Sequence, residues 1–331
     1  MNYRRFGRTG WQVSEIGYGM WGLAGWSGSD DRETLASLDR AIELGCNFFD
    51  TAWAYGDGKS EQILAQILKK HKSQAGVGGP DRHLYVATKI PPKNRRWPSR
   101  REFTLDDCYP PEYIEEYVEK SLKNLGVETI DVMQFHTWED RWLNDERLPR
   151  AIENMKKSGK VRAVGPSINR WEAWNGIRAV CEGYADAVQV IYNIFDQSPE
   201  DALFPLCRMK ETAVIARVPF DEGPLTGTLT PDSKWPAGDW RNTYFVPENL
   251  KSSLAHAEAL RPLIPEGQTM PEVALRFILN NADVSTTIPG MRKWKNVEAN
   301  CAASAAGPLP GELHKKLLGH RWDRNPTSWS Q

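Results

Sequence analysis

Short apolar runs alternate with amphipathic stretches along most of the chain. A short apolar run predicts a buried β-strand, and apolar residues spaced three or four apart predict a helix. The apolar runs cover residues 16–20, 47–50, 84–89, 130–136, 161–167, 187–192, 213–219 and 285–289. The helical patterns cover residues 30–45, 60–70, 111–126, 148–158, 171–182, 199–210 and 294–300. Residues 3–17, which precede these units, predict a β-hairpin.

The number and order of these units predict the fold class. Near-continuous apolar strands indicate a parallel sheet that is covered on both faces. Eight such units favour a closed (β/α)8 TIM barrel over an open doubly wound sheet, and no Gly-x-Gly-x-x-Gly follows any of the strands. We therefore expect an α/β protein with a single domain over residues 1–331, a barrel core over about residues 16–302 and a tail over 303–331.

Three stretches are longer than plain connections. They are residues 91–110, residues 220–250 and the segment after residue 301. Loops at the C-terminal ends of the strands build the active sites of such barrels, so we expect all three stretches at that face. The first is basic and aromatic. It is either a solvated insertion or a loop that covers the site or contacts another subunit.

Composition and charge exclude several classes of protein. Lys and Arg number 42 and Asp and Glu number 43, so the formal net charge of −1 gives no bulk attraction for nucleic acid or anionic membranes. Five cysteines without a Cys-x-x-Cys pair, and six histidines without metal-site spacing, support neither a disulfide framework nor a metal site. No apolar run approaches a membrane span of about 18 residues, and the first residues carry no secretory signal. We expect a cytoplasmic protein with no metal.

Four ionisable side chains stand at or near the predicted strand ends. Asp50, Lys89 and His136 end the second, third and fourth strands, and Tyr55 lies five residues after Asp50. A phenol is a weak acid at neutral pH, and a neighbouring ammonium lowers its pKa. We expect Lys89 to be that ammonium, Asp50 to hold it charged and His136 either to hydrogen-bond a carbonyl oxygen or to take part in a proton relay. None of these groups can deliver a hydride, so a reduction here needs a cofactor.

Each of these residues also has a simpler explanation. Asp50 could cap a helix, Lys89 could pair locally, and Tyr55 and His136 could belong to the core. A barrel lysine could also form a Schiff base, as in an aldolase. A lysine beside a carboxylate stays protonated, which argues against that second chemistry. The order and spacing of all four residues together favour proton donation to a carbonyl.

Several motifs resemble those of the aldo-keto reductases, over about residues 3–302. The main matches are Arg5-Phe6-Gly7-Arg8-Thr9-Gly10, Asp50-Thr51-Ala52-Trp53-Ala54-Tyr55-Gly56 with Ser60-Glu61, Ala87-Thr88-Lys89 and Phe135-His136. Further matches are Ser121-Leu122-x-x-Leu125-Gly126 with Asp131, Gly159-Lys160-Val161-Arg162, Gln189-x-x-Tyr192-Asn193 and Ile288-Pro289-Gly290. The resemblance is to the bacterial and potassium-channel-β-subunit-like branch of that family.

This resemblance implies a (β/α)8 barrel that binds NADP(H) and reduces a small-molecule aldehyde or ketone. It implies a catalytic tetrad of Asp50, Tyr55, Lys89 and His136, with Tyr55 as the general acid. Channel β subunits share the fold and some bind the cofactor mainly as regulators, so the alternative is a cofactor-binding regulatory subunit with little turnover. The intact tetrad favours an enzyme. The sequence does not give the oligomeric state.

The resemblance also assigns the cofactor site. It implies that Ser167 and Gln189 bind the nicotinamide amide, that Tyr192 stacks on the nicotinamide ring and that Arg292 binds a 2′-phosphate. Asn169 takes part in amide binding or has no role, and Arg217 stands where relatives often have a smaller or aromatic residue. The full expected cofactor set is Gly19, Met20, Trp21, Asp50, Ser167, Gln189, Tyr192, Val218, Pro219, Phe220, Gly223, Leu225, Gly227, Gly290, Met291, Arg292, Asn296 and Asn300.

Tryptophans near the strand ends suggest an aromatic substrate pocket. The chain contains 14 tryptophans, and indole rings often line pockets because their N–H needs a polar partner. Such a wall suits an aromatic or apolar carbonyl compound, although aromatic walls also bind sugars. The expected pocket residues are Trp21, Trp53, Tyr55, Trp97, His136 and Trp138, and Trp26 is a further candidate for this wall.

Overall fold

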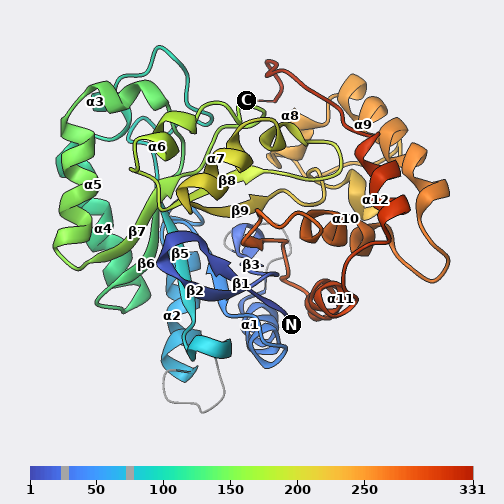
Figure 1. Ribbon diagram of the computed structural model, residues 1–331, viewed down its shortest axis with the longest axis horizontal. Coiled ribbons are helices and arrows are strands. Elements are labelled where there is room, and N and C mark those ends of the chain that lie inside the picture. The colour runs from blue at the N-terminus through green and yellow to red at the C-terminus, as the bar shows by residue number, and fades with distance from the viewer. Residues whose placement is uncertain (24–29, 72–77, 331) are drawn as a thin grey trace.

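Eight parallel strands form the centre of the computed structural model, which describes residues 1–23, 30–71 and 78–330 (Figure 1). Five of them pair side by side in chain order, namely β3 (Tyr18–Gly19), β4 (Phe48–Asp50), β5 (Tyr85–Ile90), β6 (Ile130–Phe135) and β7 (Val161–Pro166). The other three pair in the same way, namely β8 (Ala187–Ile191), β9 (Ala213–Arg217) and β10 (Thr286–Thr287).

Isolated bridges join these two groups of strands into a closed ring. Ser167, directly after β7, pairs with Gln189 of β8. On the other side, Ile16 pairs with Thr287, and Gly19 of β3 pairs with Gly290 beyond β10. All three bridges are parallel, so every strand has a parallel neighbour on both sides. The expected (β/α)8 barrel is therefore confirmed.

Helices surround this ring. Those that follow the strands in turn are α1 (Asp31–Glu43), α2 (Lys59–His71), α4 (Pro111–Leu125), α5 (Arg147–Lys157), α6 (Ile177–Cys181), α7 (Leu203–Lys210), α10 (Met270–Leu279) and α11 (Trp294–Ala305). Four more lie in the longer segments, namely α3 (Leu105–Cys108), α8 (Arg241–Tyr244), α9 (Pro247–Leu260) and α12 (Gly311–Leu318). No helix in the described part of the chain is long and apolar enough to cross a membrane.

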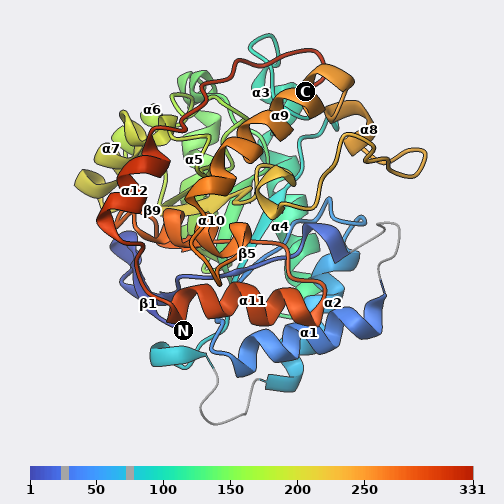
Figure 2. The ribbon, with the colours of Figure 1, turned by 90° about the vertical axis from the view of Figure 1, so that its right-hand side faces the viewer.

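The first and last barrel helices close the molecule. Figure 2 shows α11 lying beside α1, although more than 250 residues separate them in the sequence. Arg40 of α1 pairs with Glu298 of α11 at 3.0 Å and stacks on the ring of Trp294. The backbone N–H of Asn2 also donates to Ser304 at 2.8 Å. These contacts fix the start of the chain against its last barrel helix.

The predicted N-terminal hairpin consists of β1 (Tyr3–Phe6) and β2 (Trp11–Ser14), which pair antiparallel. Phe6 and Val13 are fully buried against side chains inside the barrel, among them Phe48 and Ile215. The same cluster contains Phe48, Ala187 and Ala213, which are the first residues of β4, β8 and β9. The hairpin therefore covers the end of the barrel where the strands begin, opposite their C-terminal ends. The polar candidate site residues lie at the other end of the barrel, where the strands end.

Several predicted boundaries differ from the structure. The helix predicted over 171–182 is reduced to α6, and the one predicted over 199–210 to a 3-10 turn (Ser198–Glu200) followed by α7. The strand predicted over 213–219 ends at Arg217, because Val218 adopts a positive φ of 56° that no strand allows. The strand predicted over 285–289 contains only two residues. Helices α9, α10 and α12 were not predicted.

The three long stretches lie at the expected end of the barrel. Trp97 comes from the first, Phe220 and Trp240 from the second and Ser330 from the tail, and all four line one cavity at the C-terminal ends of the strands. This placement excludes the interpretation of residues 91–110 as a wholly solvated insertion.

Candidate active site

A cavity of about 710 Å³ opens at the C-terminal ends of the barrel strands. Asp50, Tyr55 and His136 line it, and Lys89 lies fully buried behind them. The alternation of a strand explains this arrangement, since residues two apart point to the same side. Phe48 points into the barrel, so Asp50 does too, and Ala87 leads in the same way to Lys89.

The ammonium of Lys89 joins Asp50 to Tyr55. Its Nζ donates to Asp50 Oδ2 at 2.6 Å and to the Thr51 carbonyl oxygen at 2.8 Å. It also lies 3.4 Å from the Tyr55 hydroxyl oxygen. Lys89 and Asp50 are 0% and 2% exposed, so water does not screen these contacts. The structure thus brings together the first three residues of the predicted tetrad.

Two glutamines hold the second oxygen of the Asp50 carboxylate. Gln189 Nε2 donates to Asp50 Oδ1 at 2.7 Å, and Gln134 Nε2 donates to the same oxygen at 3.2 Å. With Lys89 on Oδ2, both oxygens of this buried carboxylate accept hydrogen bonds. Asp50 is therefore fixed in orientation, and it fixes Lys89 in turn.

The loop that carries Tyr55 is pinned to the barrel. Thr51 N–H donates to the Ala87 carbonyl at 2.8 Å, and the hydroxyls of Thr51 and Ser60 lie 2.7 Å apart. Ser60 N–H donates back to the Tyr55 carbonyl at 3.1 Å. Glu61, the next residue, accepts from Thr88 at 2.6 Å. The start of α2 therefore anchors the loop that positions the phenol.

Burial and charge act in opposite directions on Tyr55. Burial raises the pKa of its phenol above the usual value, and the ammonium of Lys89 lowers that pKa only in part. The expected direction of the Lys89 effect is present, but the net direction is upward. On Lys89, burial lowers the pKa, yet Asp50 and Tyr55 outweigh burial and raise it. Lys89 is therefore charged at neutral pH, which excludes a free amine for Schiff-base chemistry.

His136 completes the group in its neutral form. Burial holds the pKa of its imidazole well below the usual value, and the charges of Lys89 and Arg217 lower it further. The ring meets those of Tyr55 and Trp97 edge-on, each with a centroid distance of 5.6 Å. Its Nδ1 is buried without a hydrogen-bond partner among the described residues. A neutral imidazole in this place can hydrogen-bond a ligand that enters the cavity.

Most of the expected cofactor residues line this cavity. They are Gly19, Met20, Trp21, Asp50, Ser167, Gln189, Val218, Pro219, Phe220, Gly223, Gly290, Met291, Arg292 and Asn296. Three others lie elsewhere: Leu225 is buried in the core, Gly227 ends the short turn Pro224–Thr226, and Asn300 is buried one helical turn beyond Asn296. These three do not reach the cavity wall.

Tyr192 is placed on the wrong side for its expected role. Its side chain is fully buried, its hydroxyl donates to Glu200 at 2.5 Å, and its ring contacts Phe204 and Phe277 of the surrounding helices. Because Gln189 points into the barrel and lies three positions earlier, strand alternation turns Tyr192 outward. The expectation that Tyr192 stacks on a nicotinamide ring is therefore wrong.

Arg217 occupies the inner position instead. Ile215 points into the barrel, and Arg217, two residues later at the end of β9, lines the cavity. Its Nη2 donates to the Ile168 carbonyl at 3.0 Å, and its Nε has no partner among the described residues. Burial and the neighbouring Arg170 lower its pKa to about 10. The same period of two could have identified this position from the sequence.

The expected aromatic wall is divided. Trp21 and Trp97 line the cavity, and both remain partly exposed. Trp53 instead packs edge-on against Tyr117 at 4.8 Å. Trp138 is buried, with its indole N–H donating to Asp140 at 2.8 Å. Neither of these two belongs to the cavity, so their assignment to the substrate pocket is wrong, and Trp26 lies outside the described residues.

Sequence reasoning did not find several residues of the cavity wall. These residues lie in loops and at the ends of short helices, namely Arg170, Glu222, Trp240, Arg241 and Ser330. Asn169 lines the wall too, but its amide donates to Glu172 at 2.9 Å and to the Trp138 carbonyl at 3.2 Å. These bonds occupy Asn169 with the surrounding loops. Loop residues carry no periodic signal, so their placement depends on the tertiary structure.

The start of α11 is a candidate anion site in the cavity wall. Arg292 lines the wall two residues before the helix and has no carboxylate partner among the described residues. Lys293, the N-cap residue, makes no side-chain capping bond within the same part of the chain. Free backbone N–H groups at a helix start attract anions, and a guanidinium adds charge-assisted bonds.

The described residues contain no cluster of His, Cys, Asp or Glu that could hold a metal.

Comparison with known proteins agrees with this geometry. The model of the aldo/keto reductase family matches residues 15–320. The chain belongs to the aldo-keto reductase family. Members of this family are oxidoreductases that use a nicotinamide cofactor. The match also agrees with the resemblance found in the sequence.

Relatives of this aldo-keto reductase cover nearly its full length. The NADH-specific methylglyoxal reductase of Escherichia coli (strain K12) is 31% identical over 310 residues, 90% of this chain and 91% of that protein. The Schizosaccharomyces pombe aldo-keto reductase yakc, whose name specifies NADP(+), is 28% identical and covers 88% of this chain and 84% of that one. The holo form of AKR11C1 from Bacillus halodurans matches over 100% of both chains with a TM-score of 0.74 and 25% identity.

Proposed function

We propose that this aldo-keto reductase uses NADPH to reduce an aldehyde or ketone to an alcohol, with Tyr55 as the general acid. The observation that carries the proposal is the buried contact of one ammonium with both Asp50 and the Tyr55 hydroxyl. This contact ties the acidity of a phenol in the cavity wall to a charge that a carboxylate holds in place. If these side chains only stabilised the fold, Lys89 would not need to be charged and the Tyr55 side chain would not need to line the cavity.

The cavity residues fit a nicotinamide dinucleotide. A bound NADPH supplies the hydride that no side chain can deliver. Arg217, whose Nε has no partner in the part of the chain that the structure describes, lines the same cavity as Asp50 and Tyr55 and would contact the nicotinamide end in place of Tyr192. The loop of residues 218–223 would hold the pyrophosphate, and Arg292 with the start of α11 would hold the adenosine end. Gly290, where an added Cβ would meet no atom within 4 Å, leaves open room for it.

The remaining steps belong to residues of this chain. A carbonyl oxygen that enters beside Tyr55 and His136 would accept hydrogen bonds from both. As negative charge develops on that oxygen, Tyr55 donates its proton, and the positive charge of Lys89 stabilises the resulting phenolate. Asp50 keeps Lys89 protonated throughout. Trp21, Trp97 and Trp240 would exclude water and contact an apolar or aromatic part of the substrate.

NADPH rather than NADH is the expected cofactor, because of Arg292. The 2′-phosphate is the only difference between the two, so a residue that pairs with it acts on one cofactor alone. The names of the relatives specify NADH in one case and NADP(+) in another, so the choice depends on residues of this chain.

The direct test is a screen of aldehydes and ketones by loss of NADPH absorbance. Turnover of at least one carbonyl compound, with NADH clearly poorer, is the expected result. The panel contains aromatic, apolar and sugar aldehydes, since an aromatic wall suits each. Tight NADPH binding without turnover of any compound would instead favour the regulatory alternative.

A further inference from the structure

The chain beyond α12 returns to the cavity and is held there by a buried arginine. The Arg324 side chain is 5% exposed, and its guanidinium lies 4.7 Å from the ring centroid of Trp171 and 4.4 Å from that of Trp322. It makes two bonds to Asp221, at 2.7 and 3.3 Å, and pairs with Asp196. Desolvation offsets much of the attraction in such a cluster, so it fixes geometry more than it adds stability.

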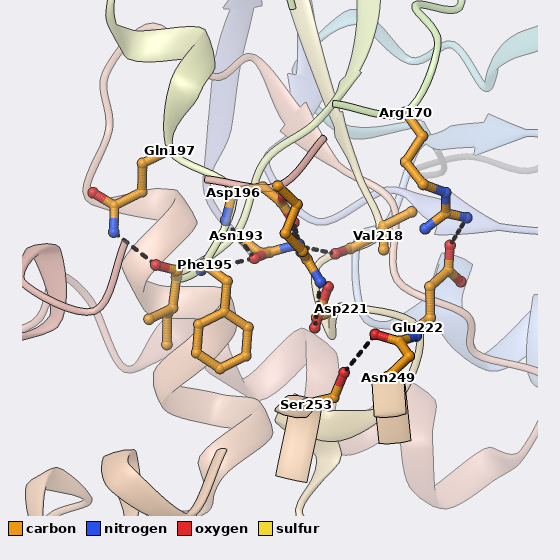
Figure 3. Close-up of polar contacts among 12 residues, drawn as sticks. Arg170, Asn193, Phe195, Asp196, Gln197, Val218, Asp221, Glu222, Asn249 and Ser253 are labelled. Carbon is orange, nitrogen blue, oxygen red and sulfur yellow. Dashed lines mark hydrogen bonds and ion pairs between the residues drawn. The ribbon is translucent and has the colours of Figure 1, made fainter. Parts of the chain in front are cut away.

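Both carboxylates belong to loops at the C-terminal ends of strands. Asp196 follows β8 and Asp221 follows β9, and they are 6% and 2% exposed. Figure 3 shows how these loops meet, with the Asn193 side chain reaching the Val218 carbonyl. Asn193 Nδ2 donates to that carbonyl at 3.0 Å and to Asp196 Oδ2 at 3.1 Å. A continuous series of contacts therefore runs from the tail to the loop after β9.

That loop has a conformation that its own residues do not favour. Val218, Asp221 and Glu222 have positive φ angles of 56°, 49° and 62°, which side chains with a Cβ rarely adopt. Such backbone persists only where its surroundings hold it. Each of the three residues is held from outside. Asn193 binds Val218, and Arg170 pairs with Glu222 at 2.7 Å (Figure 3). Arg324 binds Asp221.

We propose that Arg324 is a positioning residue, which holds residues 218–223 in the conformation that binds the dinucleotide. The proposal rests on the proposed function, since Val218, Pro219, Phe220 and Gly223 line the cavity where the cofactor would lie. Arg324 acts through Asp221 and Asp196 rather than on the reacting atoms. The tail therefore sets cofactor affinity and leaves the chemical step unchanged.

The test compares Arg324→Met and Arg324→Lys with a matched control from the same tail. Arg321 lies three residues earlier and also makes a double ion pair, with both of its bonds to Asp201 at 2.6 Å. Those contacts do not reach the loop after β9. Arg321 is more exposed than Arg324, and its Nε also donates to Asp323 at 2.8 Å. Arg321→Met therefore removes a double ion pair from the same tail without removing a bond to Asp196 or Asp221. Hydrogen exchange of the backbone amides of residues 218–227, in the protein without cofactor, reports on the loop directly.

We expect faster exchange in residues 218–227 for Arg324→Met and wild-type exchange for Arg321→Met. We also expect the Kd and KM for NADPH to rise about tenfold in Arg324→Met, while kcat at saturating NADPH changes less than about twofold. Arg324→Lys keeps one charge and should recover part of the affinity. The proposal would be overturned if Arg324→Met had the same exchange rates or the same NADPH affinity as Arg321→Met. It would also be overturned if kcat of Arg324→Met fell by as large a factor as its affinity for NADPH.

Two controls keep the outcome clear. Thermal unfolding of each variant shows whether it folds, and if Arg324→Met does not, Arg324→Lys and Asp221→Asn give the same comparison with smaller changes. If the wild type binds no nicotinamide nucleotide, the proposed function fails and the cofactor role of Arg324 fails with it. If the wild type binds NADPH but Arg324→Met binds it equally well, only the inference about Arg324 is wrong.

Discussion

At the scale of single residues, the acidity of Tyr55 depends on two opposing effects. Burial disfavours the phenolate and raises the pKa of Tyr55, while the ammonium of Lys89, 3.4 Å from the hydroxyl, favours the phenolate. Because burial has the larger effect, Tyr55 is protonated at neutral pH and ready to donate. The reverse reaction, alcohol oxidation, needs the phenolate and is therefore expected to rise with pH.

Replacing Lys89 by Met should shift the pH dependence of alcohol oxidation upward. The variant loses the charge that opposes burial, so the apparent pKa of Tyr55 should rise by about one unit or more. Initial rates of NADP(+) reduction, measured from neutral to alkaline pH, report this pKa. A profile that coincides with that of the wild type would remove Lys89 from the control of Tyr55.

The control for this variant concerns stability. Without Lys89 the buried carboxylate of Asp50 lacks its cation, which costs about 3–5 kcal/mol when one partner of a buried pair is removed. The double variant Asp50→Asn with Lys89→Met removes both charges and should recover part of that loss. A shift in the pH profile that both variants share then reflects the lost ammonium and not a damaged fold.

Sequence reasoning at this scale succeeded where strand alternation was respected. Asp50, Lys89 and His136 lie at inward positions of their strands, and the structure brings them together with Tyr55. Tyr192 failed because it was assigned by resemblance, although its position relative to Gln189 turns it outward. Trp53 and Trp138 lie in loops, where no period fixes the direction of a side chain.

At the scale of elements, we propose that the residues at the start of α11 select NADPH over NADH. Arg292 lies in the cavity wall, and a charge-assisted bond to phosphate changes affinity by about 10- to 100-fold. We predict that Arg292→Ala weakens NADPH binding by about that factor and leaves NADH nearly unchanged. Fluorescence titration with both cofactors measures this.

Lys295 offers the matched control for that variant. It is a cation in the first turn of α11, three residues after Arg292, and it is exposed and outside the cavity wall. Lys295→Ala should therefore change the affinity for NADPH less than about twofold, as expected for a screened surface charge. Equal losses for NADPH and NADH in Arg292→Ala would show that Arg292 does not bind the phosphate.

The contact between β7 and β8 gives a prediction about stability. A Cβ on Gly165 would lie 1.7 Å from the carbonyl oxygen of Ala187, which is backbone and cannot move aside alone. We predict that Gly165→Ala lowers the free energy of unfolding by about 3 kcal/mol or more, since this is overpacking against rigid backbone. Gly311→Ala is the control, because no atom lies within 4 Å of its added Cβ. Urea unfolding of both variants tests the difference.

Elements were predicted best where their pattern was local. The helices predicted over 30–45 and 111–126 appear as α1 and α4. The Asp30 side chain accepts from the backbone N–H groups of Arg32 and Glu33 at the start of α1, and Gly126 ends α4 with a positive φ. Helix α10 was missed because nearly all of its residues are buried, which leaves only the pair Glu272 and Arg276 as a narrow polar stripe. The two-residue strand β10 is too short to show a pattern of its own, and its place in the sheet depends on pairing with β9 and with Ile16.

At the scale of the whole molecule, the closed ring brings the strand ends into one cavity. Counting the strand–helix units was enough to predict this closure, because each unit adds one parallel strand beside the last. The course of the tail was not predictable in the same way. Its contacts join residues far apart in sequence, such as Arg324 with Asp196 and Ser330 with the cavity wall.

The central claim is that Tyr55 donates the proton in a reduction that depends on NADPH, and one substitution tests it. Tyr55→Phe keeps the ring and its edge-on contact with His136 but removes the O–H that the ammonium of Lys89 contacts. We predict that kcat for carbonyl reduction falls at least about 100-fold while the Kd for NADPH stays near the wild-type value. Near wild-type kcat in Tyr55→Phe would contradict it.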